Sequence, residues 1–573
     1  MGRQERRAYC CSLGDLALRL STFTRYWHTL RHLRPVQFYG RFWFRYWRPR
    51  PDLRPTPDLC ESTGPWQPPA KRLSSLSGPR DFVFLNEPGQ LDKIGWDGPQ
   101  RKKLWRYNQH YFDDLNAINA PARRAWHTAL VEDWIVENPP AHGTGWEPYP
   151  LSLRVVNWIK WSLVGAVLSP AALHSLAVQV RWLTGRLEIH LLGNHLFANA
   201  KALVFAGLFF QGKEADAWLE KGLRILERQV PEQILPDGGH FERSTMYHAL
   251  ALEDMLDLCN ATACFSSRLR ASQQKLIVEW PQRAAAMHTW LHAMCHPDGE
   301  ISLFNDAAFD ISPSIAELDA YAHRLLPALH TVTKQALAAM PDSGYIRLTR
   351  DHAVALLDVA PLGPDYLPGH AHADTLSFEL SVAEYRVLVN SGTSCYDAGS
   401  ERLRQRGTAA HNTVIVDGQD SSEVWSNFRV GRRAYPMELN IKQEPDYLPI
   451  EISCAHNGYC RLPGSPVHRR TWRIGDSSLS IEDRIEGPHN TAEARFHFHP
   501  ALQIYIHQNH KEGTALLPNG KVITWHVNHG EAHLESSTWR PCFGSMISNI
   551  CLVVKLTEGS STLYFSWAAL NTE

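Results

Sequence analysis

Several side chains that could bind a metal or move a proton gather in one segment of the chain. His370, His372 and Asp374 precede one apolar run, Asn390 ends the next, and His411 precedes a third. The first three alternate in step with the apolar residues that follow, so a regular strand would direct them toward one layer. Two histidines and an oxygen donor could hold zinc, or the groups could form a purely structural hydrogen-bonded cluster.

An Asn-His pair interrupts a strongly apolar helical stretch. On a helix, His195 shares a face with Asn199, and Asn194 lies over Lys201. These groups could face a ligand, or they could make buried hydrogen bonds between packed helices. The residues alone leave both interpretations open.

A tyrosine lies at the predicted start of another helix. If Ser244 is the N-cap, Tyr247 occupies the first turn, where the positive end of the helix dipole favours a phenolate. Arg243 would lower the tyrosine pKa in the same direction. Tyr247 could then exchange a proton near neutral pH, or it could simply be a packing residue.

Aromatic and polar residues occur together upstream of these segments. Trp146, Tyr149 and Arg154 are close in sequence, and residues 105–111 have a similar mixture. Aromatic faces can stack on sugar rings while Arg, Asn and His donate hydrogen bonds to hydroxyl and carboxylate groups. The mixture suits a carbohydrate, although many of the 20 Trp residues must belong to the core.

The elements that must position these groups fall into three regions. Residues 1–85 are rich in Arg, Trp and Pro and predict an arm that packs on the body. Residues 86–342 have apolar residues at helical spacing, ending with a predicted helix from Ile315 to Met340, and indicate a layer or ring of paired helices. Residues 343–573 alternate like short strands, with Asp417-Gly418 as a hairpin turn, and predict an antiparallel sandwich. The fold class is therefore α+β with several domains.

Composition excludes some classes of function. The chain has 573 residues and 44% hydrophobic content, enough for more than one core. Its net charge of -1 provides no global field for nucleic acid or anionic lipid. The 11 Cys residues form no CxxC pair, and no run of about 18 apolar residues predicts a transmembrane segment. Asp15 and Arg19 interrupt any signal-peptide core, so we expect a cytoplasmic protein or one with an unrecognised export route.

Seven segments of the chain, in the same order, resemble the heparinase II/III family of polysaccharide lyases, with relatives among alginate and oligoalginate lyases. They are GWEPYPLSLR, LGNHLFANAKALVFAGLFF, LPDGGHFERSTMYH, SLFNDAA, GHAHADTLSFEL, VNSGT and AAHNTV. The resemblance covers residues 25–500. It implies an N-terminal (α/α) toroid, an incomplete barrel, followed by an antiparallel β-sandwich, with the site between them.

The resemblance also implies a reaction, β-elimination at a uronic acid of an anionic polysaccharide. Asn194 and His195 would neutralise the uronate carboxylate. Tyr247 would act as the acid and, for some epimers, also as the base. His370 is the alternative base, and Tyr396 would be a second family tyrosine. The substrate-binding residues would be Trp146, Tyr149, Arg154, Glu242 and Arg243.

A zinc site is implied on two histidines and an aspartate. These positions correspond to His372, His411 and Asn390, so an asparagine stands where the family has an aspartate. A neutral amide is a poorer zinc ligand. Asp374 could compensate, or hydrogen bonds could hold the site without metal.

Two other functions stay open. A glycoside hydrolase would need two opposed carboxylates, for which Glu147, Asp237, Glu242 and Asp306 are the candidates. A non-catalytic protein for polysaccharide binding or assembly is the other. The basic aromatic start resembles an arm of relatives that accompany bacterial surface-polysaccharide synthesis, which suggests an exopolysaccharide substrate and, by family, a possible periplasmic location.

Overall fold

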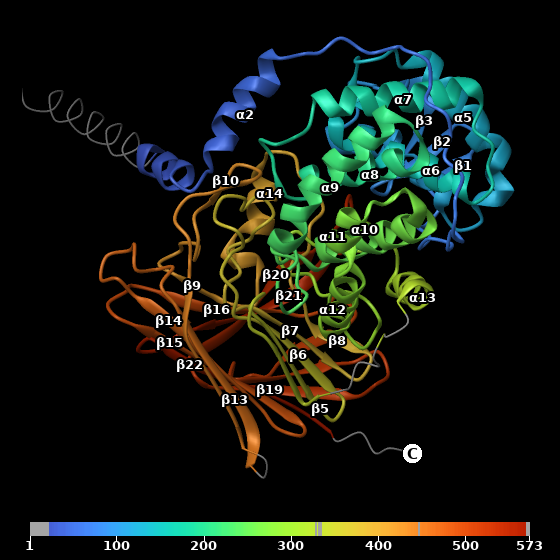
Figure 1. Ribbon diagram of the computed structural model, residues 1–573. Helices are drawn as coiled ribbons and strands as arrows, with labels where there is room; N and C mark the ends of the chain where they lie inside the picture. The colour runs from blue at the N-terminus through green and yellow to red at the C-terminus, as the bar shows by residue number, and fades with distance from the viewer. Residues whose placement is uncertain (1–21, 327–328, 330–334, 445–446, 569–573) are drawn as a thin grey trace, which may run out of the picture.

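The computed structural model describes residues 22–326, 329, 335–444 and 447–568. A helical region is followed by a region of antiparallel sheets, and the two lie against each other (Figure 1). This order confirms the predicted α+β class. No helix within the described residues is both long and apolar enough to cross a membrane.

The helical region contains the elements that carry the first half of the site. Its helices are α3 (Leu91–Ile94), α4 (Lys103–Tyr111), α5 (Arg124–Glu137), α6 (Pro148–Leu163), α7 (Pro170–Gly185), α8 (Gly193–Phe209), α9 (Lys213–Gln233), α10 (Thr245–Cys264), α11 (Ala271–Ile277), α12 (Trp280–Ala293) and α13 (Ile315–Leu325). Helix α10 begins where predicted, because the Ser244 side chain accepts a hydrogen bond from the amide of Tyr247 at 3.2 Å.

The β region consists mainly of three antiparallel sheets. The first is β4 (Leu337–Met340), β5 (Tyr345–Arg350), β6 (Ala353–Asp358), β7 (Phe378–Val382) and β8 (Tyr385–Leu388). The second orders β12 (Pro436–Glu444), β13 (Tyr447–His456), β14 (Val467–Ile474), β15 (Ser478–Glu486), β22 (Ser560–Trp567), β19 (Val522–His529), β18 (Glu512–Leu516) and β17 (Gln503–Ile506). The third orders β20 (Glu531–Trp539), β21 (Ile547–Lys555), β16 (Ala492–His497) and β9 (Val414–Val416).

These sheets bury a common apolar core. Leu380 from β7, Ile481 from β15 and Val554 from β21 belong to one buried cluster, so the inner faces of all three sheets meet there. Face-to-face antiparallel sheets agree with the predicted sandwich. The Asp417-Gly418 turn is also present, with both residues at positive φ.

The boundary between the two regions differs from the prediction. Helix α13 ends at Leu325, and Leu337–Met340 forms strand β4 rather than the end of a helix. Strand β4 pairs with β5, so the β region begins before residue 343. The apolar run fits either period, and pairing with β5 decides in favour of a strand.

The N-terminal arm contains more regular structure than expected. It has a helix over residues 22–30, helix α2 (Pro35–Tyr46), and strands β1 (Leu76–Gly78) and β2 (Asp81–Phe84). Strand β2 pairs with β3 (Glu87–Gln90), just beyond the arm. The arm contacts both regions. Trp425, in the small hairpin of β10 (Val424–Trp425) and β11 (Arg429–Val430), bonds to Thr29, and Phe44 packs on His190.

Candidate functional site

A fully buried carboxylate, Asp306, joins the two regions at the candidate site. Its oxygens accept hydrogen bonds from His370 Nδ1 and His372 Nε2, both at 2.9 Å, and from Thr393 Oγ1 at 3.1 Å. Arg402, on α14 (Ser400–Arg406), binds both oxygens, with Nη2 at 2.6 Å from Oδ2. Burial alone would raise the pKa of Asp306, but Arg402 and the histidines hold it well below its usual range.

Loops hold the two histidines, contrary to the predicted strand. Strand β7 begins only at Phe378, and residues 370–377 form a loop in which Leu376 has φ 63°. The amide of Asp306 donates to the His370 carbonyl at 2.9 Å, and the His372 amide donates to Asn305 Oδ1 at 3.0 Å. The histidines converge because two loops bind each other, and the predicted strand over residues 370–377 is wrong.

Two tyrosines lie beside His370. The hydroxyl groups of Tyr247 and Tyr396 are 3.0 Å apart, and the Tyr247 and His370 rings have centroids 4.1 Å apart. Burial, and then the neighbouring Tyr396, raise the pKa of Tyr247 well above its usual value. The expected lowering of this pKa was wrong, because burial outweighs the helix terminus. Arg243 does not contribute, since its guanidinium donates to the backbone carbonyls of Ser343 and Asp342.

An imidazole with a raised pKa lies at the start of α8. His195 Nδ1 is 3.2 Å from Glu188 Oε2, and the His195 ring packs on Tyr149 with centroids 4.5 Å apart. Burial would lower the pKa of His195, but the Glu188 carboxylate outweighs it and raises this pKa. Asn194 and His195 are both half-buried, whereas Asn199 is fully buried and bonds to Ser152 and Glu188. The pair therefore faces outward while Asn199 is structural.

Glu242 lies between these groups. It is 2% exposed, with Oε2 3.8 Å from His370 Nε2. Burial raises the pKa of Glu242, while His370, His195 and the backbone amide of Asn194 act in the opposite direction. Its carboxylate thus couples the two histidines and faces the first turn of α8, where the helix dipole favours an anion. A direct role in substrate binding, expected from the sequence, does not suit so buried a group.

The Glu188–His195 pair predicts a pH dependence for the elimination that the sequence resemblance implies. A protonated His195 can neutralise a substrate carboxylate, and kcat/KM should fall as the pH rises through its raised pKa. In Glu188→Gln the raising charge is absent, so this alkaline fall should move to lower pH. A pH profile of kcat/KM tests this, with Glu220→Gln at an exposed ion pair as the matched control. An unshifted alkaline limb in Glu188→Gln would contradict it.

A second histidine cluster adjoins Asp306 on its far side. His372, Asp374 and His411 bring three possible ligand atoms within 4.8 Å of one another. Asn390 Oδ1 is 3.2 Å from His411 Nδ1, so the asparagine orients that ring. Buried His372 Nδ1 and His411 Nε2 have no hydrogen-bond partner. Burial is the main cause that lowers the pKa of both histidines, to about 4 for His372. Both imidazoles are therefore neutral, as metal ligation requires.

This donor set fits zinc. Two neutral imidazoles and the Asp374 carboxylate match its preference for nitrogen and oxygen ligands, and Asp306 supplies the supporting hydrogen bond to His372. In this arrangement Asp374 would take the place of the family aspartate, and Asn390 would support His411. A bound zinc would fix these side chains behind His370.

Two predicted substrate-binding residues lie in the helical core. Arg154 is fully buried and donates to Gln179 and to the backbone carbonyls of His110 and Gly145. Trp146 is 4% exposed, and its indole nitrogen donates to the Asn138 carbonyl. Both predictions are corrected, because these side chains donate to backbone carbonyls at the ends of α4 and α5 and in the 3-10 helix of residues 144–146 and do not reach the site.

The sequence did not predict the roles of three residues of the site. Asp306 was considered only as a hydrolase carboxylate, and Arg402 and Glu188 were not singled out. The motif SLFNDAA contains Asp306, so this segment carried a usable signal. Neither Arg402 nor Glu188 had such a signal. Arg402 acts through Asp306, which is remote in sequence, and the effect of Glu188 on His195 depends on burial.

A helical region followed by antiparallel sheets is also the fold of solved heparinase III structures. The chain belongs to the heparinase II/III-like family. The model of the heparinase II/III N-terminus matches residues 108–325, and that of the heparinase II/III-like C-terminal region matches residues 332–568.

The chain is also similar to individual proteins and solved structures. The chain is 24% identical to a heparin-sulfate lyase of Bacteroides stercoris over 44% of its own length and 40% of the relative's, so it aligns with less than half of that lyase. It is 25% identical to FtsZ-localized protein C of Caulobacter vibrioides over 82% of this chain and 81% of that one. The crystal structure of heparinase III has TM-score 0.65 at 18% identity, covering 84% of this chain and 80% of that chain, which confirms the fold.

Proposed function

We propose that this protein cleaves a uronic-acid-containing polysaccharide by β-elimination. The observation that carries the proposal is the convergence of three functions in one place. His195 beside Asn194 can neutralise a carboxylate, His370 is oriented by Asp306, and Tyr247 carries a proton next to Tyr396. β-Elimination needs these three functions, a neutraliser, a base and an acid.

The reaction follows from the protonation states. With the uronate carboxylate neutralised by His195 and Asn194, the C5 proton becomes acidic. His370 donates through Nδ1 to Asp306, so its Nε2 is free to accept that proton. The C5–H electron pair forms the C4–C5 double bond as the C4–O bond breaks. Tyr247, protonated because of its raised pKa, gives its proton to the leaving oxygen.

Three of the four carboxylates that a glycoside hydrolase could use are already engaged. Asp306 is fully buried and bonded to four side chains, and Glu242 is 2% exposed. Asp237 accepts from the amides of Gly239 and Ser343. Glu147 binds Tyr107 and Lys103. Only the Glu242 carboxylate, among these four, has no hydrogen-bond partner, and one carboxylate cannot supply the two opposed groups that hydrolysis across a sugar needs.

The substrate is a polymer with uronate residues, and we include a bacterial exopolysaccharide among the candidates. Purified protein should be incubated with heparan sulfate, alginate and uronate-containing exopolysaccharides while ultraviolet absorbance follows the unsaturated uronate product. A rising signal supports elimination. Cleavage into products without the double bond would indicate hydrolysis, and polymer binding without cleavage would indicate the non-catalytic alternative.

A further inference from the structure

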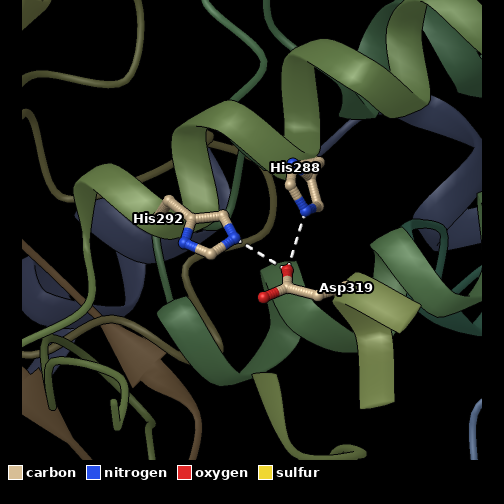
Figure 2. Close-up of side chains that lie close together, drawn as sticks. All are labelled: His288, His292 and Asp319. Carbon is tan, nitrogen blue, oxygen red and sulfur yellow. Dashed lines mark hydrogen bonds and ion pairs between the residues drawn. The ribbon is translucent and has the colours of Figure 1, made fainter. Parts of the chain in front are cut away.

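A second cluster of metal-ligating side chains lies apart from Asp306, between α12 and α13 (Figure 2). His288 and His292 are one turn apart on α12, and Nε2 of each is 2.7 Å from Oδ1 of Asp319 on α13. The ligand atoms of all three residues lie within 4.8 Å of one another. None of these residues takes part in the elimination proposed above.

The geometry suits a small transition-metal ion. Zinc bonds of about 2.1 Å in tetrahedral geometry separate neighbouring ligand atoms by roughly 3.4 Å, so a slight outward shift of Asp319 would admit the ion. His288 is 5% exposed and held in place, whereas His292 and Asp319 are 29% and 31% exposed and leave an entry path. Two imidazoles favour zinc-like ions over magnesium or calcium.

We propose that His288, His292 and Asp319 form a binding site for Zn²⁺ or a similar divalent transition metal. The ion would take the Nε2 lone pairs of the two neutral imidazoles, whose ring protons would then lie on Nδ1, and an oxygen of Asp319, with water in its open position. It would link α12 to α13, the last helix before the β region, and so stabilise that end of the helical region.

Metal titration of the full-length protein tests this site. After chelator treatment, Co²⁺ and then Zn²⁺ are added to wild type, His292→Ala and His142→Ala, a control at an exposed histidine in the loop before α6. Wild type and the control should bind one more tight equivalent than His292→Ala and show a Tm increase with Zn²⁺ that His292→Ala lacks. His411→Ala should retain this equivalent, which separates it from the cluster behind His370. Equal stoichiometry and equal Tm shifts in wild type and His292→Ala would overturn the proposal.

A separate observation concerns α2, whose outer face is an aromatic stripe. The stripe consists of Phe38, Tyr39, Phe42, Trp43 and Tyr46, which are 51%, 61%, 69%, 56% and 72% exposed. At about 3.6 residues per turn these positions form one continuous face. Phe23 and Trp27 of the preceding helix are 70% and 59% exposed.

The opposite face of α2 fixes the arm to the protein. Gln37 is buried and donates to the Tyr366 carbonyl at 3.1 Å. Gly40 is buried against His190, where an added Cβ would come within 3.0 Å. Because this face is occupied, the stripe faces away from the body, and α2 lies along the outside of the molecule (Figure 1).

Charge indicates what the stripe contacts. Residues 22–51 contain seven Arg and no Asp or Glu, although the whole chain has net charge -1. Arg41 and Arg45 are exposed on α2, on the edge between the stripe and the packed face. Arginines beside exposed Trp, Phe and Tyr are typical of helices that lie in the interface of an anionic bilayer. With 12 residues, or about 18 Å, α2 is too short to span one.

We infer that the arm binds the surface of an anionic lipid membrane, with the stripe at the headgroup level and the arginines on lipid phosphates. The negligible global charge predicted no such contact. The arginines of the arm provide this contact locally, because surface binding depends on charge within about a Debye length of the lipid.

Vesicle sedimentation of the full-length protein tests the arm. Wild type should sediment with phosphatidylcholine vesicles that contain phosphatidylglycerol, weakly with phosphatidylcholine alone, and less at high salt. The triple variant Phe42→Ser, Trp43→Ser, Tyr46→Ser should lose at least about tenfold in binding, and so should Arg41→Gln with Arg45→Gln. Tyr505→Ser, at an exposed β-region aromatic, is the control and should bind like wild type. Absence of binding, equal binding by the triple variant, or stripe-dependent self-association without lipid binding would overturn the inference.

Discussion

Tyr247→Phe is expected to lower kcat by about 10²- to 10⁴-fold while leaving the fold and polymer binding nearly unchanged. The raised pKa keeps the hydroxyl protonated at neutral pH, so it can serve as the acid for the leaving oxygen. Phenylalanine keeps the ring beside His370 and removes only the transferable proton. Production of unsaturated uronate under saturating substrate measures the effect.

A matched substitution distinguishes chemistry from structure. Tyr321 is also buried on a helix, and its hydroxyl donates to Asp257 at 2.9 Å, away from the site. Tyr321→Phe should therefore cost stability with little loss of kcat. If Tyr247→Phe retains near wild-type kcat, Tyr247 is not the acid, and Tyr396, whose hydroxyl is 3.0 Å away, becomes the candidate.

Asp306→Asn is expected to cost about 3 to 5 kcal/mol of the free energy of unfolding and most of the activity. The substitution leaves the fully buried Arg402 guanidinium without a counter-charge. It also weakens the bond that orients His370 Nδ1, so the base loses its alignment. Urea denaturation and the uronate assay measure the two effects.

Asp92→Asn is the control for this prediction. Asp92 pairs with Arg80 at 2.5 Å, and their side chains are 69% and 41% exposed, so water can replace the lost contact. We expect a cost below about 1 kcal/mol and normal activity. Equal costs for the two variants would show that Asp306 is not the electrostatic centre of the site.

The pH dependence of stability should also reflect Asp306. Its folded-state pKa is depressed, so its contribution is present above the carboxyl pKa of the unfolded chain. That contribution is lost as the pH falls toward the folded value. In Asp306→Asn this part of acid destabilisation should disappear, because no titrating carboxyl remains there.

Much of this protein could be determined from its sequence. Helical and strand periodicities gave the order of the two regions, and Ser244 marked the start of α10 because a cap is a local interaction. The resemblance brought together Asn194, His195, Tyr247 and His370, which the structure places around Glu242 and Asp306. Such features depend on residues near one another in the chain or on a motif as a whole.

The tertiary structure alone decided how these groups behave. Whether Tyr247 has a raised or lowered pKa depends on burial by distant segments, which outweighs the nearby helix terminus. The resemblance makes Arg154 a substrate ligand, yet its guanidinium donates to the carbonyl of His110 in α4 and to that of Gly145 in the short 3-10 helix before α6. Asp306 became the centre of the site because Arg402, 96 residues away, supplies a charge in a water-excluded place. Interaction strength there is set by the dielectric surroundings, which no local sequence pattern contains.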